Sequence, residues 1–530
     1  MTRAILTERV LLALILALGA ALRVWLLLGP FGEIDADEAV VGLMAMQVPG
    51  ELPAFYWEQQ YLGTLEPLTA ALVFAVAGGP SAAALKLVPD AFSMVFVFLV
   101  YLTARPVFGP GPALVSALYL AIPPSFFAAW SVKARGGYPE ALALGQVCLL
   151  AAQRLADACS MRRSAILGWS LTCGLAAGLA LWTHPLAVVM VVSAGTYLLL
   201  AWRPWRPAGR ADRPIVAALG VAAVGLVVGL APAIVHNVAH DFPSLRFAAG
   251  GGTEPRAALL NLWGLIRYGL PVLVGLAEGT PSRELLLQDW PTRPGSSWLV
   301  TILLPLLGLW LVWWYRGSLL ALVRGGSTPR ERGPALFLLI LLLVPPFAAV
   351  SRFANLWAEP RYALPIYAAV PLVASIVYAA RLRGRLPGRL LLGALLALNL
   401  FSLVTSDYRL SLPTNAGEST AANRATLIRA LEARGIDRIY TDYWLAYPIA
   451  FESHEVIVPS VWSGGFGRRA SYSHLVFISP SPAFVFARDT PGDAEFRARL
   501  AELGGRATLE EIGIYRLYTD VEPLDALRRP

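Results

Sequence analysis

Closely spaced carboxylates near the amino terminus are the residues of this chain best suited to acid–base chemistry. Asp35, Asp37 and Glu38 lie directly after an apolar run that is long enough to cross a bilayer as a helix. A carboxylate beside a bound hydroxyl group can act as a general base. From Val24 to Leu85 the chain has acidic residues but no Lys or Arg, and such a loop is typical of the non-cytoplasmic side of a membrane.

Basic residues that could complement these carboxylates occur in two later segments. Lys133 and Arg135 lie in the sequence SVKARGGYPE, and Arg352 and Arg361 lie in SRFANLWAEPRY. A basic cluster can hold the phosphate of a lipid-linked donor as a leaving group, and arginine suits phosphate because its donors form a fork. The alternatives are a snorkelling interface residue for Lys133 and contact with anionic lipid headgroups for the arginines.

The composition places these residues in a membrane protein. Of the 530 residues, 57% are hydrophobic and 15% are charged, and the mean hydropathy is +0.59, which differs from the usual composition of soluble domains. The formal net charge of +8 lies in short arginine clusters between apolar blocks. Because the positive-inside rule explains these clusters, nucleic-acid binding is not expected. A helical bundle is the expected architecture.

The arginine clusters also predict the topology of the bundle. With a cytoplasmic amino terminus, eleven apolar segments can span the membrane so that every inner loop carries arginine. The apolar segment 64–79 is too short to cross comfortably, so we interpret it as a re-entrant or interfacial helix within a structured first outer loop, 30–83. A second long outer loop is predicted at 237–296. The predicted spans are about 9–29, 84–104, 112–130, 139–157, 164–183, 185–202, 214–236, 297–316, 334–350, 362–380 and 389–406.

Residues 407–530 carry mixed charges and differ in this from the predicted transmembrane region, 1–406. Helical periodicity at 424–434 and 494–503 alternates with short apolar strands, which predicts a small α/β domain. After an odd number of spans this domain is expected to be extracytoplasmic. The predicted strands are 438–441, 455–459, 475–479, 484–487 and 512–518.

Four motifs together resemble a known family. They are I-D-A-D-E-A-x-x-G-L-M-A after the first span, YLGTLEP, KARGGY and EPRYALPIY. Over roughly residues 1–410 the chain resembles the bacterial polyprenyl-phosphate-sugar-dependent glycosyltransferases of the GT-C fold, which are related to protein O-mannosyltransferases and to the aminoarabinose transferase of lipid A. The resemblance implies a multi-pass enzyme of the inner (plasma) membrane. Such an enzyme moves a sugar, with inversion, from a polyprenyl-phosphate donor to a hydroxyl of a lipid, glycan or protein acceptor on the outer face.

The resemblance also implies roles for individual residues. The catalytic base falls on Asp37, with Glu38 adjacent to it. Glu66 resembles a second acidic position that helps to place acceptor or metal, and its structural alternative is a first-turn carboxylate that interacts with the helix dipole. The implied contacts to the donor phosphate are Arg361, Tyr362, Arg135 and Lys133.

The role of Asp35 and the need for a metal stay open at this point. A D-x-D pair could hold a divalent ion, Mg²⁺ or Mn²⁺, but no cofactor is certain from the sequence. Alternatively, Asp35 caps the next helix and Glu38 completes a capping box. His184, His236 and His240 match no zinc-binding spacing, so hydrogen-bonded interfacial imidazoles are the favoured interpretation.

Two other functions compete with glycosyl transfer. One is a transporter or flippase of lipid-linked sugars, and the other is a non-catalytic membrane scaffold whose outer domain binds a partner. A transporter predicts inverted repeats and charges near the bilayer midplane. The chain shows no clear repeat and its charges gather at one face, which favours the transferase.

Overall fold

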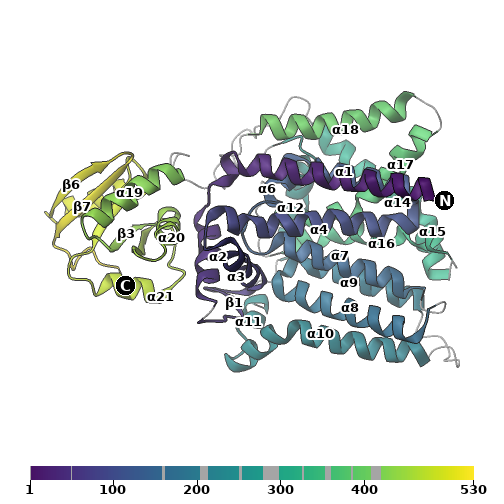
Figure 1. Ribbon diagram of the computed structural model, residues 1–530, viewed down its shortest axis with the longest axis horizontal. Helices are drawn as coiled ribbons and strands as arrows, with labels where there is room; N and C mark the ends of the chain where they lie inside the picture. The colour runs from purple at the N-terminus through teal and green to yellow at the C-terminus, as the bar shows by residue number, and fades with distance from the viewer. Residues whose placement is uncertain are drawn as a thin grey trace.

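Long helices lying side by side form the larger part of the molecule, and a small α/β domain adjoins one end of them (Figure 1). The structure is a computed structural model that describes residues 2–48, 50–157, 161–202, 213–249, 254–277, 298–324, 328–351, 360–382, 386–406 and 419–529. The first loop contributes α2 (Ala36–Gln47), β1 (Phe55–Tyr56), β2 (Gln59–Gly63) and α3 (Leu65–Ala77). These elements lie at the end of the bundle next to the domain, and the amino terminus lies at the opposite end (Figure 1).

Eight helical stretches among the described residues are long and apolar enough to cross a membrane, by length and composition. Each coincides with one of the predicted spans, so the fold is that of a multi-pass helical membrane protein, and the total of eleven remains a prediction. The stretches are Ile5–Leu27, Ala82–Phe108, Arg163–Thr183, Pro185–Trp202, Ile215–Ala239, Val300–Arg324, Pro329–Val350 and Arg361–Ala380.

The bundle combines these long helices with shorter ones. The longer helices are α1 (Thr2–Leu27), α4 (Ala82–Phe108), α5 (Pro110–Ala121), α7 (Tyr138–Leu155), α8 (Arg163–Thr183), α9 (Val188–Trp202), α10 (Arg213–Ala239), α14 (Trp298–Arg324), α16 (Pro334–Val350), α17 (Val370–Leu382) and α18 (Leu386–Thr405). The short ones are η1 (Pro30–Gly32), α6 (Ser125–Trp130), η3 (Pro185–Ala187), α11 (Pro243–Ala249), α12 (Pro255–Gly264), the π-helix η5 (Leu265–Gly269), α13 (Leu270–Leu273), α15 (Pro329–Arg332) and η7 (Arg361–Ala369).

The prediction of one continuous helix over 112–130 is wrong. Helix α5 ends at Ala121 and α6 begins at Ser125, because Pro123 and Pro124 lie between them. Proline has no amide hydrogen for the helical ladder, and the residue before a proline avoids helical dihedral angles. The break turns α6 into a short buried helix that leads directly into the basic segment at 131–137.

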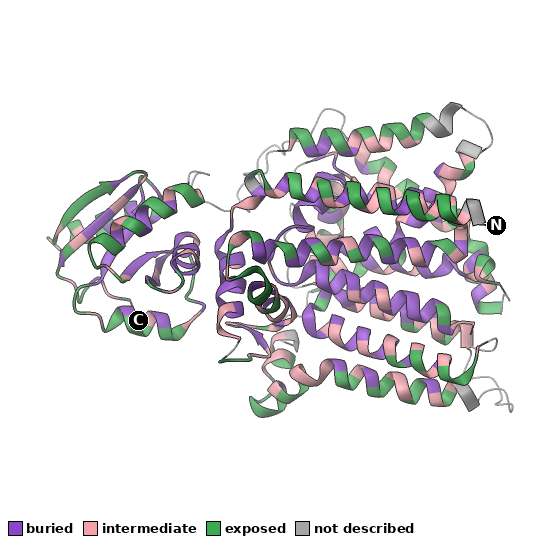
Figure 2. Cartoon of the chain, viewed as in Figure 1, coloured by how far each residue is buried: buried purple, intermediate pink, exposed green. Residues whose placement is uncertain are grey.

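Burial follows the position of each helix in the bundle (Figure 2). Helix α7 is buried along most of its length, whereas α1, α10 and α14 expose many apolar side chains, as lipid-facing helices do. Helices α8 and α10 approach each other through glycines on both sides. A Cβ atom at Gly178 would come within 2.4 Å of the Leu226 carbonyl oxygen, so only a small residue permits this packing.

A five-stranded mixed sheet forms the centre of the C-terminal domain. Its order is β4-β3-β5-β7-β6; β3 is parallel to β4 and β5, and β7 is antiparallel to β5 and β6. Along β5, Phe484 and Phe486 belong to one buried cluster and Val485 belongs to another, because successive side chains point to opposite faces. The elements are α19 (Ala421–Ala433), β3 (Arg438–Asp442), α20 (Tyr443–Glu452), β4 (Val458–Ser463), α21 (Ala470–Phe477), β5 (Ala483–Ala487), α22 (Pro491–Glu502), β6 (Arg506–Ile512) and β7 (Tyr515–Glu522).

The domain confirms the predicted α/β class and corrects two predicted strands. Most of the segment 475–479 belongs to helix α21, in which Tyr472 and Val476 are buried at the i, i+4 spacing of a helix. The segment 512–518 contains the turn between β6 and β7, where Gly513 has a φ of +60°. The predicted domain boundary at 406/407 adjoins residues outside the described part of the chain.

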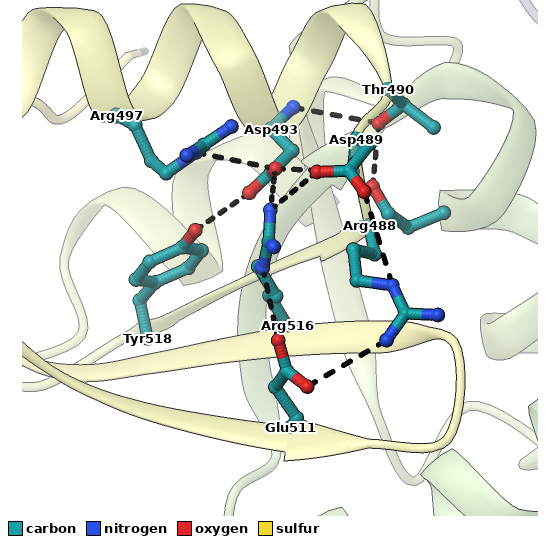
Figure 3. A network of polar contacts seen from close by, with 9 residues as sticks. Arg488, Asp489, Thr490, Asp493, Arg497, Glu511, Arg516 and Tyr518 are labelled. Atoms are coloured by element: carbon teal, nitrogen blue, oxygen red, sulfur yellow. Dashed lines mark hydrogen bonds and ion pairs between the residues drawn. The ribbon is translucent and has the colours of Figure 1, made fainter.

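A buried carboxylate, Asp493, ties α22 to this sheet (Figure 3). It accepts a hydrogen bond of 2.6 Å from the Tyr518 hydroxyl and one of 2.5 Å from Nη1 of Arg516. Arg497 Nε lies 3.3 Å from the same carboxylate. Since a satisfied buried network rigidifies its surroundings, these bonds fix the first turn of α22 against β7.

The first loop and the C-terminal domain share one apolar core. Buried side chains of α2, such as Val41, lie in the same cluster as Phe451 of α20 and Trp462 of β4. Gly42 allows α2 and α20 to approach, because a Cβ atom there would lie 2.5 Å from Cε2 of Phe451. Buried Arg424 of α19 adds an ion pair of 3.2 Å to Glu33.

Replacement of Gly42 by alanine tests this contact. Ala normally favours a helix over Gly, but here its methyl group collides with a buried ring, so we expect a destabilisation of about 1–3 kcal/mol. Gly195→Ala is the matched control, since a Cβ atom at this exposed helical glycine meets nothing within 4 Å. Thermal unfolding in detergent measures both variants. Equal melting temperatures for the two variants would contradict the close packing of α2 on α20.

Candidate active site

Asp35 and Glu38 begin helix α2 and hold it in place. Oδ1 of Asp35 accepts from the Glu38 amide at 2.9 Å, and Oε2 of Glu38 accepts from the Asp35 amide at 3.2 Å. The capping box that the sequence offered as an alternative is therefore present. The other oxygen of Glu38 binds Lys86 Nζ at 2.6 Å and the Ala134 amide at 3.0 Å. Both carboxylates are buried, and their bonds fix the direction of α2.

Asp37 occupies a different environment, although it lies between these two residues. Its side chain is 21% exposed, whereas the side chains of Asp35 and Glu38 are fully buried. Oδ2 of Asp37 pairs with Nη2 of Arg135 at 2.6 Å. Oδ1 accepts from the Tyr443 hydroxyl and lies 3.6 Å from Nη2 of Arg468. Asp37 is thus the partly accessible carboxylate of the motif.

The electrostatic surroundings keep Asp37 ionised. Burial opposes the charged form, but the charges of Arg135 and Arg468, the hydrogen bond from Tyr443 and the charge of Arg361 together leave the pKa of Asp37 below its usual value. The pKa of the Tyr443 hydroxyl is raised, chiefly by burial and then by the Asp37 charge. Tyr443 therefore donates the proton in this bond and Asp37 accepts it.

Three of the predicted basic residues gather around Trp130, the last residue of α6. The cationic groups of Lys133, Arg135 and Arg361 lie 5.5, 6.0 and 5.4 Å from its ring centroid, which is within the range of cation–π contact. Tyr362, the fourth residue predicted here, packs edge-on to Tyr138 at 6.3 Å. Arg352 lies outside the described residues.

The same basic residues reach the carboxylates of α2. Nζ of Lys133 lies 4.0 Å and Nη1 of Arg135 lies 3.4 Å from Oδ2 of Asp35. The glycine-rich turn after Arg135 places Gly136 and Gly137 at positive φ, +81° and +70°, and this brings the segment back to α7. The structure therefore brings together the acidic motif, KARGGY and the Arg361-Tyr362 pair, as the sequence predicted.

Glu66 lies behind this segment and not at its exposed side. Its Oε2 accepts from the Tyr56 hydroxyl at 2.7 Å and from the Gly137 amide at 2.9 Å. Among the described residues, Oε1 of Glu66 has no hydrogen-bond partner. Burial raises the pKa of Glu66 to about 7, and the Glu38 charge adds to the rise. Glu66 is therefore protonated below about pH 7, and it supports the loop of Arg135 through the Gly137 amide.

The donor set does not fit a divalent metal ion. Asp35 and Asp37 each face guanidinium groups, and Glu38 is paired with Lys86, so the local charge that a cation would meet is already neutralised. Within the described part of the chain, no three His, Cys, Asp or Glu residues lie together as a metal site would require. The metal alternative for the D-x-D pair gains no support from this geometry.

The three histidines are engaged in other contacts. Nδ1 of His184 accepts from the Leu186 amide at 3.0 Å, and burial, together with the Arg361 charge, lowers the pKa of His184 to about 3. Nε2 of His236 lies 2.7 Å from Oε1 of Gln60, and its ring stacks on His240. These contacts agree with hydrogen-bonded imidazoles at the ends of helices.

Three residues of this site were not predicted from the sequence. Trp130 could have been found, because it directly precedes the basic segment and aromatic rings pair with cations. Tyr443 and Arg468 come from the C-terminal domain, from the start of α20 and the loop after β4. Nothing in their local sequence indicates which surface of that domain contacts α2.

Comparison with known proteins gives this arrangement a family context. Residues 65–234 match the family model described as dolichyl-phosphate-mannose-protein mannosyltransferase. ArnT from Cupriavidus metallidurans, solved bound to undecaprenyl phosphate, is similar with a TM-score of 0.55 at 14% identity, covering 96% of this chain and 99% of that chain. The chain has the GT-C fold, and part of it matches a glycosyltransferase family model.

A second GT-C structure is similar over the whole chain. The archaeal oligosaccharyltransferase AglB from Archaeoglobus fulgidus, in complex with an inhibitory peptide and a dolichol-phosphate, has a TM-score of 0.52 at 13% identity, covering 98% of this chain and 75% of that chain. A sequence search of curated proteins finds no match. The predicted resemblance to GT-C glycosyltransferases is confirmed.

The titration of Glu66 generates a prediction about stability. Folding raises its pKa from 4.5 to about 7, so its neutral form contributes stability that is fully present below pH 4.5 and lost as the pH rises to 7. Glu66→Gln cannot ionise and keeps an acceptor for Tyr56 and Gly137. We expect the melting temperature of Glu66→Gln, relative to the parent protein, to increase from pH 5 to pH 8, equivalent to roughly 1–3 kcal/mol. Glu58→Gln, at an exposed position, is the control. A melting-temperature difference between Glu66→Gln and the parent protein that stays constant with pH would contradict the raised pKa of Glu66.

Proposed function

We propose that this protein transfers a sugar from a polyprenyl-phosphate donor to an acceptor hydroxyl, with Asp37 as the general base. The observation that carries the proposal is the environment of Asp37. It is a partly exposed, ionised carboxylate on which Arg135, Arg361 and Arg468 converge from separate parts of the chain. The ligands in the structures of ArnT and AglB, undecaprenyl phosphate and dolichol-phosphate, support the choice of donor.

The basic cluster suits a phosphate that gains charge during the reaction. Four cations, Lys133, Arg135, Arg361 and Arg468, surround two carboxylates, Asp35 and Asp37. The excess positive charge favours a phosphate monoester, which carries about −1.5 to −2 near neutral pH, over the singly charged diester of the donor. Groups that bind developing charge more strongly than the ground state lower the barrier. We assign the phosphate to Arg361 and Arg135, with Lys133 contributing charge and Tyr362 lining the site.

The proposed reaction balances without a general acid. Asp37 takes the proton of the acceptor hydroxyl, and the oxygen attacks the anomeric carbon from the face opposite the phosphate. The bond between the anomeric carbon and the phosphate oxygen breaks, and its electron pair stays on the phosphate. Because this leaving group departs already charged and held by arginines, it needs no proton. The product has the inverted configuration at the anomeric carbon.

Glu38 and Glu66 support this site in the proposal. Glu38 is fully buried, unlike Asp37, and has bonds to Lys86, the Ala134 amide and the Asp35 amide, so an acceptor cannot reach it. Glu66 holds the loop of Arg135 through the Gly137 amide. We therefore assign the base to Asp37 alone and give Asp35, Glu38 and Glu66 positioning roles.

The outer face of the plasma membrane is the proposed location of the site. The first loop has no Lys or Arg between Val24 and Leu85, and the predicted inner loops carry arginine. The first loop and the C-terminal domain lie at the same end of the bundle, opposite the amino terminus (Figure 1). A cytoplasmic amino terminus then places Asp37 and the domain, 407–530, outside. The donor enters laterally from the bilayer.

Asp37→Asn tests the function directly. Asparagine keeps the shape and removes the basic oxygen, so we expect transfer to fall by a factor of about 10²–10⁴ while the protein stays folded. Glu58→Gln, an exposed carboxamide substitution in the same loop, is expected to keep full activity. The assay follows release of polyprenyl phosphate from a sugar donor by purified protein in detergent.

The same assay separates the competing functions. A flippase needs two membrane faces and a scaffold has no turnover, so multiple turnovers in detergent exclude both. Full activity of Asp37→Asn would refute the assignment of the base. Absence of turnover with every polyprenyl-phosphate sugar offered, in folded protein, would refute the transferase proposal.

A further inference from the structure

The C-terminal domain places two side chains directly on Asp37. Tyr443 is the first residue of α20, and its hydroxyl donates to Oδ1 of Asp37. Arg468 lies in the loop between β4 and α21, and its Nη2 is 3.6 Å from the same oxygen. Nε of Arg468 also donates to the Tyr443 hydroxyl at 3.1 Å. Tyr443, Arg468 and Asp37 therefore form a closed triangle of polar contacts across the domain boundary.

Arg468 is held in this triangle from several directions. Its guanidinium lies 4.6 Å from the ring centroid of Phe466 and 5.6 Å from that of Tyr443. With the Gln59 amide turned so that its oxygen faces the guanidinium, that oxygen accepts from Nη1 and Nη2 at 3.1 and 3.2 Å. Arg468 is 9% exposed. A guanidinium fixed by two rings and an amide has little freedom to leave Asp37.

Tyr443 is fixed by the way α20 begins and by what α20 packs on. Oδ1 of Asp442 accepts from the amides of Trp444 and Leu445 at 2.9 and 3.2 Å, which caps the helix at the residue before Tyr443. Helix α20 then packs on α2 through Phe451 and Gly42. Since α2 also carries Asp37, one packing contact sets the distance between hydroxyl and carboxylate.

We propose that Tyr443 and Arg468 are positioning residues for Asp37, so that the first loop and the C-terminal domain form one catalytic unit. The proposal rests on the function of Asp37 given above and goes beyond it, because it assigns part of the site to a domain outside the motifs that resemble the GT-C family. In this unit Tyr443 and Arg468 hold Oδ1 while Arg135 holds Oδ2. The carboxylate is then oriented before the acceptor arrives, which reduces the entropy lost in reaching the transition state.

The contacts have a second effect, on the protonation of Asp37. A hydrogen bond to the charged form and a nearby cation both favour ionisation, and the pKa of Asp37 lies below its usual value. Loss of the Tyr443 hydroxyl removes one of these effects, so the pKa of Asp37 should rise. The charged and titratable groups around Asp37 are Asp35 and Glu38 on α2, Arg135 of the KARGGY loop, Arg361 of η7, Tyr61 of β2, and Tyr443, Tyr447 and Arg468 of the C-terminal domain.

The pH dependence of kcat/KM in Tyr443→Phe tests the proposal. The acidic limb reports the protonation of Asp37, because only the ionised form can act as base. We expect this limb to move to higher pH by about one unit, the size of one hydrogen bond to a charged group. We also expect kcat to fall about tenfold with little change in the KM for the donor.

Tyr518→Phe is the matched control. It removes the same kind of bond, a tyrosine hydroxyl to an aspartate in the same domain. The aspartate here is Asp493, whose contacts include none of the proposed site residues (Figure 3). We expect its acidic limb to coincide with that of the parent protein even if its melting temperature falls. A loss of domain stability alone would thus lower the amount of active enzyme and leave the limb in place.

Substitutions of Arg468 test the proposal independently of whether Tyr443→Phe folds. Arg468→Gln removes a full charge, so its acidic limb should move to higher pH by more than that of Tyr443→Phe, and Arg468→Lys should restore part of the shift. An unmoved limb in Tyr443→Phe or in Arg468→Gln, with Asp37→Asn inactive, overturns the positioning proposal and leaves the proposed function standing. An active Asp37→Asn overturns the proposed function itself.

Discussion

The charge on Asp37 is the constraint on which the rest of the site depends. Burial disfavours an ionised carboxylate, and here three guanidinium groups and a tyrosine hydroxyl compensate for it. These groups come from the loop after α6, from η7 and from the C-terminal domain. No single element could supply them, so the helices must place three distant parts of the chain around one side chain. Breaks and turns such as Pro123-Pro124 and Gly136-Gly137 serve this placement.

Two kinds of packing keep those parts in register. Within the bundle, glycines let α8 and α10 approach closely, and buried α7 fixes the end of the basic segment. At the end of the bundle, α2 and α20 share a core in which Gly42 meets Phe451. The contacts of Asp37 with Tyr443 and Arg468 depend on this apolar contact, because it brings the two surfaces together. Hydrophobic burial therefore positions Asp37, and its polar neighbours keep its carboxylate ionised.

The sequence predicted the class of the fold and most of the charged residues of the site. Apolar runs and arginine clusters indicated the helices, and the spacing of Asp35 and Glu38 offered, as one of two alternatives, the capping box that orients α2. The prediction missed the break between α5 and α6, because it followed hydropathy alone, although Pro123 and Pro124 mark the break in the sequence. Tyr443 and Arg468 were not predicted, since contacts between segments far apart in the sequence depend on tertiary packing that no local pattern encodes. The strand predicted at 475–479 was wrong for the same reason. Its short apolar run belongs mostly to helix α21, which is stabilised by the burial of Tyr472 and Val476.

A density map of the protein with a non-transferable polyprenyl-phosphate sugar analogue tests the central claim most directly. The account predicts the phosphate within hydrogen-bond distance of Arg361 and Arg135, with the anomeric carbon facing Asp37 on the side opposite the phosphate oxygen. Tyr443 and Arg468 should remain beside Oδ1 of Asp37. An anomeric carbon that faces Asp35, Glu38 or Glu66, or a phosphate bound away from the arginines, would contradict the account.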